Sequence, residues 1–95
     1  MENLQEVALK VYDAIFRDLK AVVIDDLEYP FIETSTSKVK YVNIGGYTFI
    51  EQNPKKASRW GKMAREGHKI IWVMKGRRYL VQVKDGKYID LKKKD

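Results

Sequence analysis

Residues 39–50 have the sequence VKYVNIGGYTFI, in which two apolar-rich runs flank the pair Gly45-Gly46. Glycine takes positive φ at both central positions of a two-residue turn without steric cost, so this stretch predicts a β-hairpin. Side chains alternate between the two faces of a strand, so this register separates two sets of residues. One face carries Val42, Ile44, Tyr47 and Phe49, and the other carries Tyr41, Asn43 and Thr48.

A helix is predicted before this hairpin, over residues 2–20, where apolar residues recur at helical spacing. Leu9 and Ala14 widen its apolar arc to roughly 220°, whereas packing on one core needs roughly 100°. The excess apolar surface predicts contact with a second subunit, so we expect a homodimer or larger homo-oligomer formed through this helix. Residues 21–24 and 27–32 are predicted strands on either side of Asp25-Asp26.

The second half of the chain is predicted to contain one more helix and three more strands. Asn53-Pro54 is typical of an N-cap followed by proline at the first helical position, and the helix should end at Gly67. Two-residue turns are expected at Lys75-Gly76 and Asp85-Gly86. The strands that they join are predicted at residues 70–74, 77–83 and 87–91.

This order of elements predicts an α+β fold. We expect an antiparallel sheet of hairpins, with the N-terminal amphipathic helix and the second short helix packed on one of its faces. At 95 residues the chain should form a single domain, because two smaller units would each lack a sufficient core.

The composition argues against several classes of protein. The chain has no cysteine, which excludes disulfides, thiolate nucleophiles and sulfur-ligated metal. No run approaches the roughly 18 apolar residues of a membrane span. Residues 1–20 are acidic and amphipathic, unlike a signal or transit peptide, so we expect a cytoplasmic protein. Charged residues make up 34% of the chain, a proportion typical of proteins from thermophiles.

Charges of the two signs are segregated along the chain. Residues 1–50 hold five Lys or Arg against eight Asp or Glu, a net charge of −3, whereas residues 51–95 hold 14 against five, a net charge of +9. A positive potential of this kind usually serves a polyanionic partner. The alternative is a lysine-rich surface coat with no ligand.

The basic second half is also aromatic, and the two properties together predict a surface for single-stranded nucleic acid. Bases stack on flat rings at roughly 1–3 kcal/mol each, while adjacent cations hold the phosphates. Phosphate contacts are expected from Lys55, Arg59, Lys62 and Arg65 of the second helix and from Arg77 and Arg78. Base stacking is expected from Trp60, Trp72, Tyr79 and Tyr88.

Alternatives stay open for these residues. The predicted turn at Lys75-Gly76 sets Trp72 directly opposite Tyr79, and such a cross-strand pair can equally pack beneath a helix. A cationic helix face can equally be a solvated one. If the sheet face that carries Trp72, Tyr79 and Tyr88 is exposed but binds a protein partner, the domain is a regulatory or scaffold module.

The sequence predicts neither catalysis nor a cofactor. His68 is the only histidine, and one histidine without cysteine cannot form a zinc site of the ordinary kinds. No serine or threonine has an identifiable partner base. Asp25, Asp26 and Glu28 offer carboxylates for Mg²⁺, but a metal-dependent nuclease needs more ligands than these supply, so this alternative ranks below the binding function.

Several segments of the second half resemble one known family. They are Asn53-Pro54, Ser58-Arg59-Trp60, Ala64-Arg65-Glu66-Gly67-His68 and Ile71-Trp72-Val73, followed by short hairpins. In this order they resemble the ThermoDBP-related proteins, which bind single-stranded DNA in thermophilic archaea, and the resemblance covers residues 39–91 best. It implies a helix-backed antiparallel sheet, a basic and aromatic cleft that takes the bases inward, and oligomers built through helices. We therefore expect residues 1–95 to be one non-catalytic domain that binds single-stranded DNA, with RNA as the other candidate.

Overall fold

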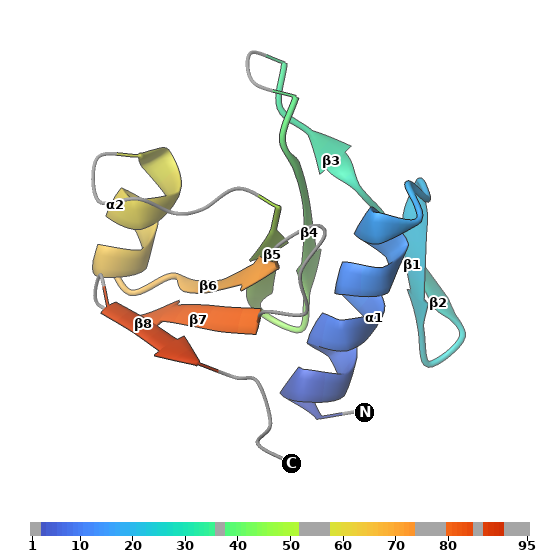
Figure 1. Ribbon diagram of the computed structural model, residues 1–95, viewed down its shortest axis with the longest axis horizontal. Coiled ribbons are helices and arrows are strands. Elements are labelled where there is room, and N and C mark those ends of the chain that lie inside the picture. Colours follow the sequence, from blue (N-terminus) through green and yellow to red (C-terminus); the bar gives the residue numbers. More distant parts are fainter. Residues whose placement is uncertain (1–2, 36–37, 52–57, 74–79, 85–86, 91–95) are drawn as a thin grey trace.

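The computed structural model describes residues 3–35, 38–51, 58–73, 80–84 and 87–90, with the backbone course alone for the last two ranges. Helix α1 comprises Leu4–Phe16 and helix α2 comprises Arg59–Arg65. The strands are β1 (Ala21–Ile24), β2 (Leu27–Pro30), β3 (Ile32–Glu33), β4 (Lys40–Ile44), β5 (Tyr47–Ile50), β6 (Lys69–Val73), β7 (Leu80–Lys84) and β8 (Lys87–Asp90). The predicted α+β fold is confirmed (Figure 1). Within these ranges neither helix is long and apolar enough to cross a membrane.

The strands form two sheets. Strands β1 and β2 form a hairpin of their own, and the other six form one sheet in the order β3-β4-β5-β6-β7-β8. Neighbours in the large sheet are antiparallel except β5 and β6, which are parallel. Parallel neighbours need a crossover connection, and here that connection contains α2. The sheet is therefore mixed, whereas the sequence predicted an antiparallel one.

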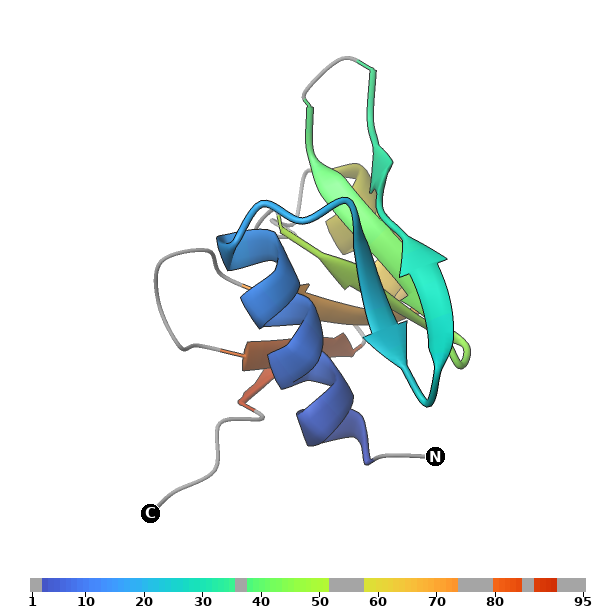
Figure 2. The same ribbon diagram turned by 90° about the vertical axis from the view of Figure 1, so that its right-hand side faces the viewer.

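The two helices lie on opposite faces of the large sheet, which corrects the prediction that both cover one face. Helix α1 packs through Ile15 on a core that includes Phe49 and Ile71. Helix α2 contributes to a second core that includes Ile50 and Ile70. Because successive strand residues point to opposite faces, these neighbouring pairs assign the helices to different sides. In Figure 2, α1 lies in front of the strands and part of α2 is visible behind β4 and β5.

Helix α1 begins later and ends earlier than predicted. The Asn3 side chain caps its N-terminus by accepting a 2.9 Å hydrogen bond from the Glu6 backbone N–H. At the other end, Asp18 has a φ of 57° and the Leu19 backbone N–H donates to the Ala14 oxygen at 2.9 Å. This is the hydrogen-bond pattern with which helices commonly end at glycine. Aspartate takes the left-handed position here, so the sequence lacked the usual stop signal.

Asp18 also links the end of α1 to the large sheet. Its carboxylate accepts a hydrogen bond from the Lys40 ammonium group on β4. This hydrogen bond, assisted by the charge of the carboxylate, raises the pKa of Lys40 above its ordinary value. Because the Asp18 side chain is 75% exposed, water screens the pair, and we regard it as orienting the helix end more than stabilising the fold.

The β4–β5 hairpin confirms the predicted two-residue turn. Gly45 and Gly46 have φ values of 59° and 83°, and the strands pair in the expected register. The expected polar face is present, with a 2.8 Å hydrogen bond from the Thr48 hydroxyl to the Asn43 side-chain oxygen. The β1–β2 hairpin turns in the same way through Asp25 and Asp26, at φ values of 50° and 66°, without any glycine.

Helix α2 begins at Arg59, later than predicted. Its N-cap is Ser58, whose hydroxyl accepts a 3.1 Å hydrogen bond from the backbone N–H three residues later. The predicted start at Asn53-Pro54 lies outside the described residues. The predicted end is confirmed, because Gly67 has a φ of 99° directly after the helix.

The registers of the C-terminal strands were predicted correctly for one pair and incorrectly for the other. Strands β7 and β8 pair Val83 with Tyr88, as predicted. Strands β6 and β7 pair Trp72 with Val81 rather than with Tyr79, a register shifted by two residues from the predicted one, and the predicted turn at Lys75-Gly76 lies outside the described residues. Because side chains alternate with a period of two, this shift by two residues does not change the face of the sheet on which Trp72 and Val81 lie.

Replacing Gly46 by alanine is expected to destabilise the protein through the turn alone. A Cβ at this position meets no atom within 4 Å, so the cost comes from the φ of 83° and not from a clash. We expect the free energy of unfolding to fall by about 1–2 kcal/mol. Urea unfolding measures this change, provided that the m-value is the same for both proteins.

Gly46→Asn is the matched control, since asparagine enters the left-handed region more readily than alanine does. We expect a smaller loss for this variant. Equal losses for the two variants would contradict a backbone origin of the cost.

Candidate nucleic-acid interface

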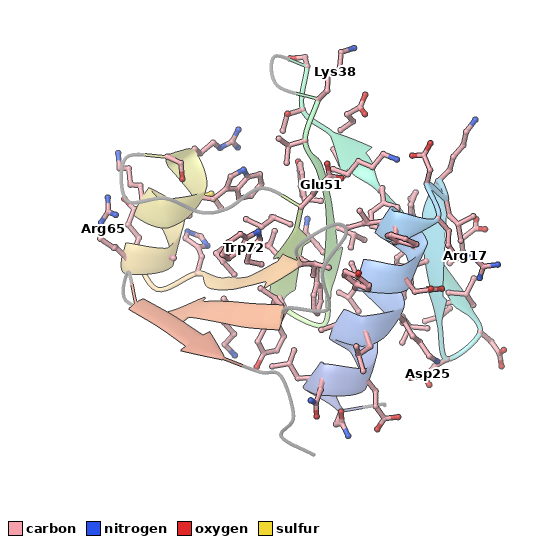
Figure 3. All side chains as sticks on the ribbon, viewed as in Figure 1. Arg17, Asp25, Lys38, Glu51, Arg65 and Trp72 are labelled. Carbon is pink, nitrogen blue, oxygen red and sulfur yellow. The ribbon has the colours of Figure 1, made fainter. Side chains whose placement is uncertain are left out.

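The outer side of α2 carries three cations one turn apart. Arg59, Lys62 and Arg65 are exposed, while Trp60 and Ala64 on the inner side are buried. Residues three apart lie on the same side of a helix, so these cations form one stripe. Figure 3 shows Arg65 pointing away from the sheet. We call Arg59, Lys62 and Arg65 the α2 basic face.

The position of this face is fixed by the packing on the inner side of α2. The Trp60 ring centroid lies 5.0 Å from that of Tyr41 on β4, with the ring planes at 60°. Ile50, Ala64 and Ile70 complete this small core. Because Trp60 is buried, α2 cannot rotate about its axis. The same three cations therefore always face solvent.

Trp60 itself is a core residue, which corrects its predicted role in base stacking. Only 5% of its surface is exposed, and that leaves no free ring face for a base. The sequence had placed it opposite the cations, and this is the side that packs on the sheet. The Arg59 guanidinium lies 5.7 Å from its ring centroid, within cation–π range. Trp60 therefore helps to position a predicted phosphate contact.

Trp72 lies at the border between core and surface. It is half-buried in β6, on the same face as Ile70, and its strand neighbours are Ile50 and Val81. In the view of Figure 3 it lies between α2 and β5. Part of its surface remains exposed, so the ring stays a candidate for base stacking.

The other predicted contacts are not described at the level of side chains. Tyr88 occupies β8 opposite Val83, and only its backbone is described. The predicted contacts outside the described residues are Lys55, Arg77, Arg78 and Tyr79. The structure therefore places the α2 basic face and Trp72 on one side of the large sheet, and the remaining contacts stay predictions.

The carboxylates considered for a nuclease form a turn and a strand end. Asp25 and Asp26 make the β1–β2 turn, and Glu28 is exposed on β2. In the part of the chain that the structure describes, no group of three or more acidic or histidine side chains is arranged to hold a metal ion. His68 is exposed just after α2, and its backbone N–H donates to the Met63 oxygen at 3.1 Å as part of the helix end.

An apolar surface on the side of α1 was predicted only in part. The exposed large apolar residues are Leu9, Phe16, Leu19, Val23, Leu27 and Ile32. Leu9 belongs to the wide apolar arc that the helical spacing indicated, whereas Ala14 from the same arc is buried. Alternation along β1 could have identified Val23, because its neighbours Val22 and Ile24 are both buried. Leu19 and Val23 line a groove between α1 and β1.

Comparison with protein-family models, curated proteins and solved structures gives no match to this chain. The resemblance to the ThermoDBP-related proteins therefore stays a prediction. The function has to be inferred from the residues of the chain and their geometry.

Substitutions of Trp60 should separate a core role from a ligand-binding role. Trp60→Ala is expected to lower the free energy of unfolding by about 3–5 kcal/mol, because it empties the space between α2 and the sheet. Trp60→Phe keeps most of that volume, so we expect a folded protein that binds a short oligothymidylate as the unmodified chain does. Urea unfolding and fluorescence anisotropy measure the two properties. A Trp60→Phe protein of unchanged stability that no longer binds would contradict the core assignment.

Proposed function

We propose that the protein binds single-stranded nucleic acid, without sequence preference and without catalysis, through the α2 basic face and the adjoining sheet. The observation that carries this proposal is that Arg59, Lys62 and Arg65 are exposed on a helix whose other side is held in the core. Cations one turn apart on a helix of fixed orientation suit a ligand with regularly spaced negative charges. A phosphate backbone has this property and is recognised through it without regard to sequence.

The overall charge distribution supports the same class of ligand. The net charge of +9 over residues 51–95 contrasts with −3 over residues 1–50. A positive region of this size attracts polyanions over distances comparable with the Debye length, about 8 Å at physiological ionic strength. The α2 basic face lies within the positive half of the sequence, so attraction and contact would act at the same place.

The partly exposed ring of Trp72 favours a single-stranded ligand over a duplex. A base stacks on an aromatic ring only when it is free of its own partner, and such stacking tolerates every base. The half-buried ring of Trp72 is on the side of the sheet that α2 covers. Whether the strand is DNA or RNA depends on contacts to the 2′-hydroxyl group, for which the chain gives no indication.

A protein partner is the second candidate, and a different surface favours it. Phe16, Val23 and Leu27 each have more than half of their surface exposed, at 55%, 56% and 60%. These residues lie on α1, β1 and β2, away from the α2 basic face. A partner bound there would be held by apolar contact, whose strength depends weakly on salt, and the two candidates can be distinguished in this way.

We also propose that a second copy of the chain covers the exposed side of α1. A stripe of alternating charge runs along this side, formed by Glu6, Lys10, Asp13 and Arg17. Two copies related by a two-fold axis and packed antiparallel bring Glu6 opposite Arg17 and Lys10 opposite Asp13. A two-fold interface must be self-complementary, and this stripe is. Leu9 and Phe16 beside the stripe would be buried by the same contact.

Salt dependence tests the nucleic-acid proposal. We expect the affinity for a short oligothymidylate to fall log-linearly with salt concentration. Arg59→Gln combined with Lys62→Gln removes two phosphate contacts, which should lower the magnitude of the slope by about 1.4. The matched control, Lys20→Gln with Lys38→Gln, removes the same charge from two exposed positions in the first half and should leave the slope unchanged. Equal slopes for the two double variants would contradict the α2 basic face as the contact.

Charge reversal tests the proposed assembly. Lys10→Glu would set two carboxylates against each other across the two-fold axis, and we expect the dimer dissociation constant to rise at least about tenfold, or about 1.4 kcal/mol. Lys10→Glu combined with Asp13→Lys restores opposite charges and should restore the dimer. Sedimentation at several protein concentrations measures both. An unmodified chain that stays monomeric at every concentration would refute the proposal.

A further inference from the structure

Four residues of the large sheet occupy one row across neighbouring strands. The parallel pair β5–β6 sets Tyr47 beside Lys69, and the antiparallel pair β7–β8 sets Lys84 beside Lys87. The β6–β7 register passes through Ile70 opposite Val83, and its next step brings Lys69 alongside Lys84. The row is therefore Tyr47, Lys69, Lys84 and Lys87, and we call its three cations the lysine row.

A row of like charges of this kind works against the stability of the sheet. Neighbouring strands are about 4.7–4.9 Å apart, so the three lysines span about 10 Å with no residue of opposite sign in the row. Like charges directly opposite one another on paired strands are destabilising. An anion bound over the row would relieve this repulsion, so the register itself points to an anionic ligand.

Among the three cations of the lysine row, Lys69 is the one whose side chain the structure describes. It is exposed, and its ammonium nitrogen lies 5.2 Å from the centroid of the Tyr47 ring. The ring attracts the cation through its face without neutralising the charge. The described contact thus holds Lys69 in place while leaving its charge for another group.

The row lies at the end of the sheet next to the C-terminal end of α2. Lys69 is the first residue of β6 and follows α2 after a short turn that contains Gly67 and the exposed His68. Figure 1 shows the start of β6, the end of β7 and the start of β8 gathered beside that end of α2. Arg65, the last residue of α2, therefore leads directly to the row, with Glu66 as the acidic residue between them.

We infer that the lysine row is a second phosphate-binding segment, on which a single nucleic-acid strand continues after it leaves the α2 basic face. This inference rests on the proposed function and specifies the path of the ligand. Lys69 is on the same face of β6 as Ile71, and Trp72 is on the opposite face. A nucleic-acid strand that contacts both the α2 basic face and Lys69 therefore passes around the end of the sheet, and does not stay on the face that carries Trp72. Flexible lysine side chains act as point charges and suit a backbone that is held without sequence preference.

Lys69→Gln combined with Lys84→Gln tests this path. We expect the magnitude of the salt slope for a short oligothymidylate to fall by about 1.4. Between about 50 mM and 200 mM salt, the affinity difference from the unmodified chain should then shrink about sevenfold. Lys69→Arg with Lys84→Arg keeps the charges and should keep the slope. The double variant Lys20→Gln with Lys38→Gln serves as the control of equal charge.

The melting temperature without ligand provides the second measurement. If the lysines are kept for a ligand, their removal relieves repulsion, so the Lys69→Gln, Lys84→Gln protein should melt at the same temperature as the control or higher. Weaker binding together with a lower melting temperature would overturn the inference, because the lysines would then serve the fold.

The outcomes separate this inference from the function on which it rests. An unchanged slope for the lysine-row variant, with a reduced slope for Arg59→Gln and Lys62→Gln, would overturn the path and leave the α2 basic face as the contact. An unmodified chain that shows no salt-dependent binding of the oligonucleotide would overturn both.

Discussion

Two neighbouring isoleucines, Ile70 and Ile71, are both fully buried, and the arrangement of the molecule follows from this constraint. They point to opposite faces of β6, so this strand has to be covered on both sides. Helix α1 covers one side and α2 covers the other. A strand buried on both faces is typical of parallel pairing, and β6 is indeed the strand that pairs in parallel, with β5.

The same constraint separates the two kinds of surface that the protein offers. Because α1 and α2 lie on opposite sides of one sheet, the apolar residues around α1 and the cations of α2 face different directions. A second copy on α1 and a polyanion on α2 would therefore not compete for the same surface. In such a dimer each protomer would carry its own α2 basic face, so two segments of one strand or two separate strands could be bound together.

Local chemistry determined which features could be predicted from the sequence. Gly45-Gly46 specifies its hairpin through backbone conformation alone, and the register and faces of β4 and β5 follow from it. Gly67 likewise marks the end of α2. Asp18 and Ser58 give weaker signals, because aspartate at a helix end and serine before a helix occur in many other contexts. The early end of α1 and the late start of α2 were missed for this reason.

Features that depend on distant parts of the chain could not be predicted. The strand–helix–strand order over residues 47–73 allows parallel pairing, but it does not show that the two strands are neighbours, because that depends on contacts with the rest of the sheet. The same holds for the candidate site. The helical period correctly separated Arg59 from Trp60, yet whether the aromatic side or the basic side meets solvent depends on the sheet beneath. The lysine row is visible only once the registers of four strands are known.

The parallel pairing also has a consequence for the order in which the protein folds. The β4–β5 hairpin joins residues that are close in sequence, whereas β5 meets β6 only when residues 47–50 and 69–72 come together across the connection that contains α2. Loop closure of that length is entropically unfavourable, and such contacts form late. Until β6 docks, one edge of β5 has no partner and can pair with a strand of another molecule. Strand β5, which lies inside the folded sheet, is thus an exposed edge strand until β6 docks. Association of nascent chains would begin at this edge.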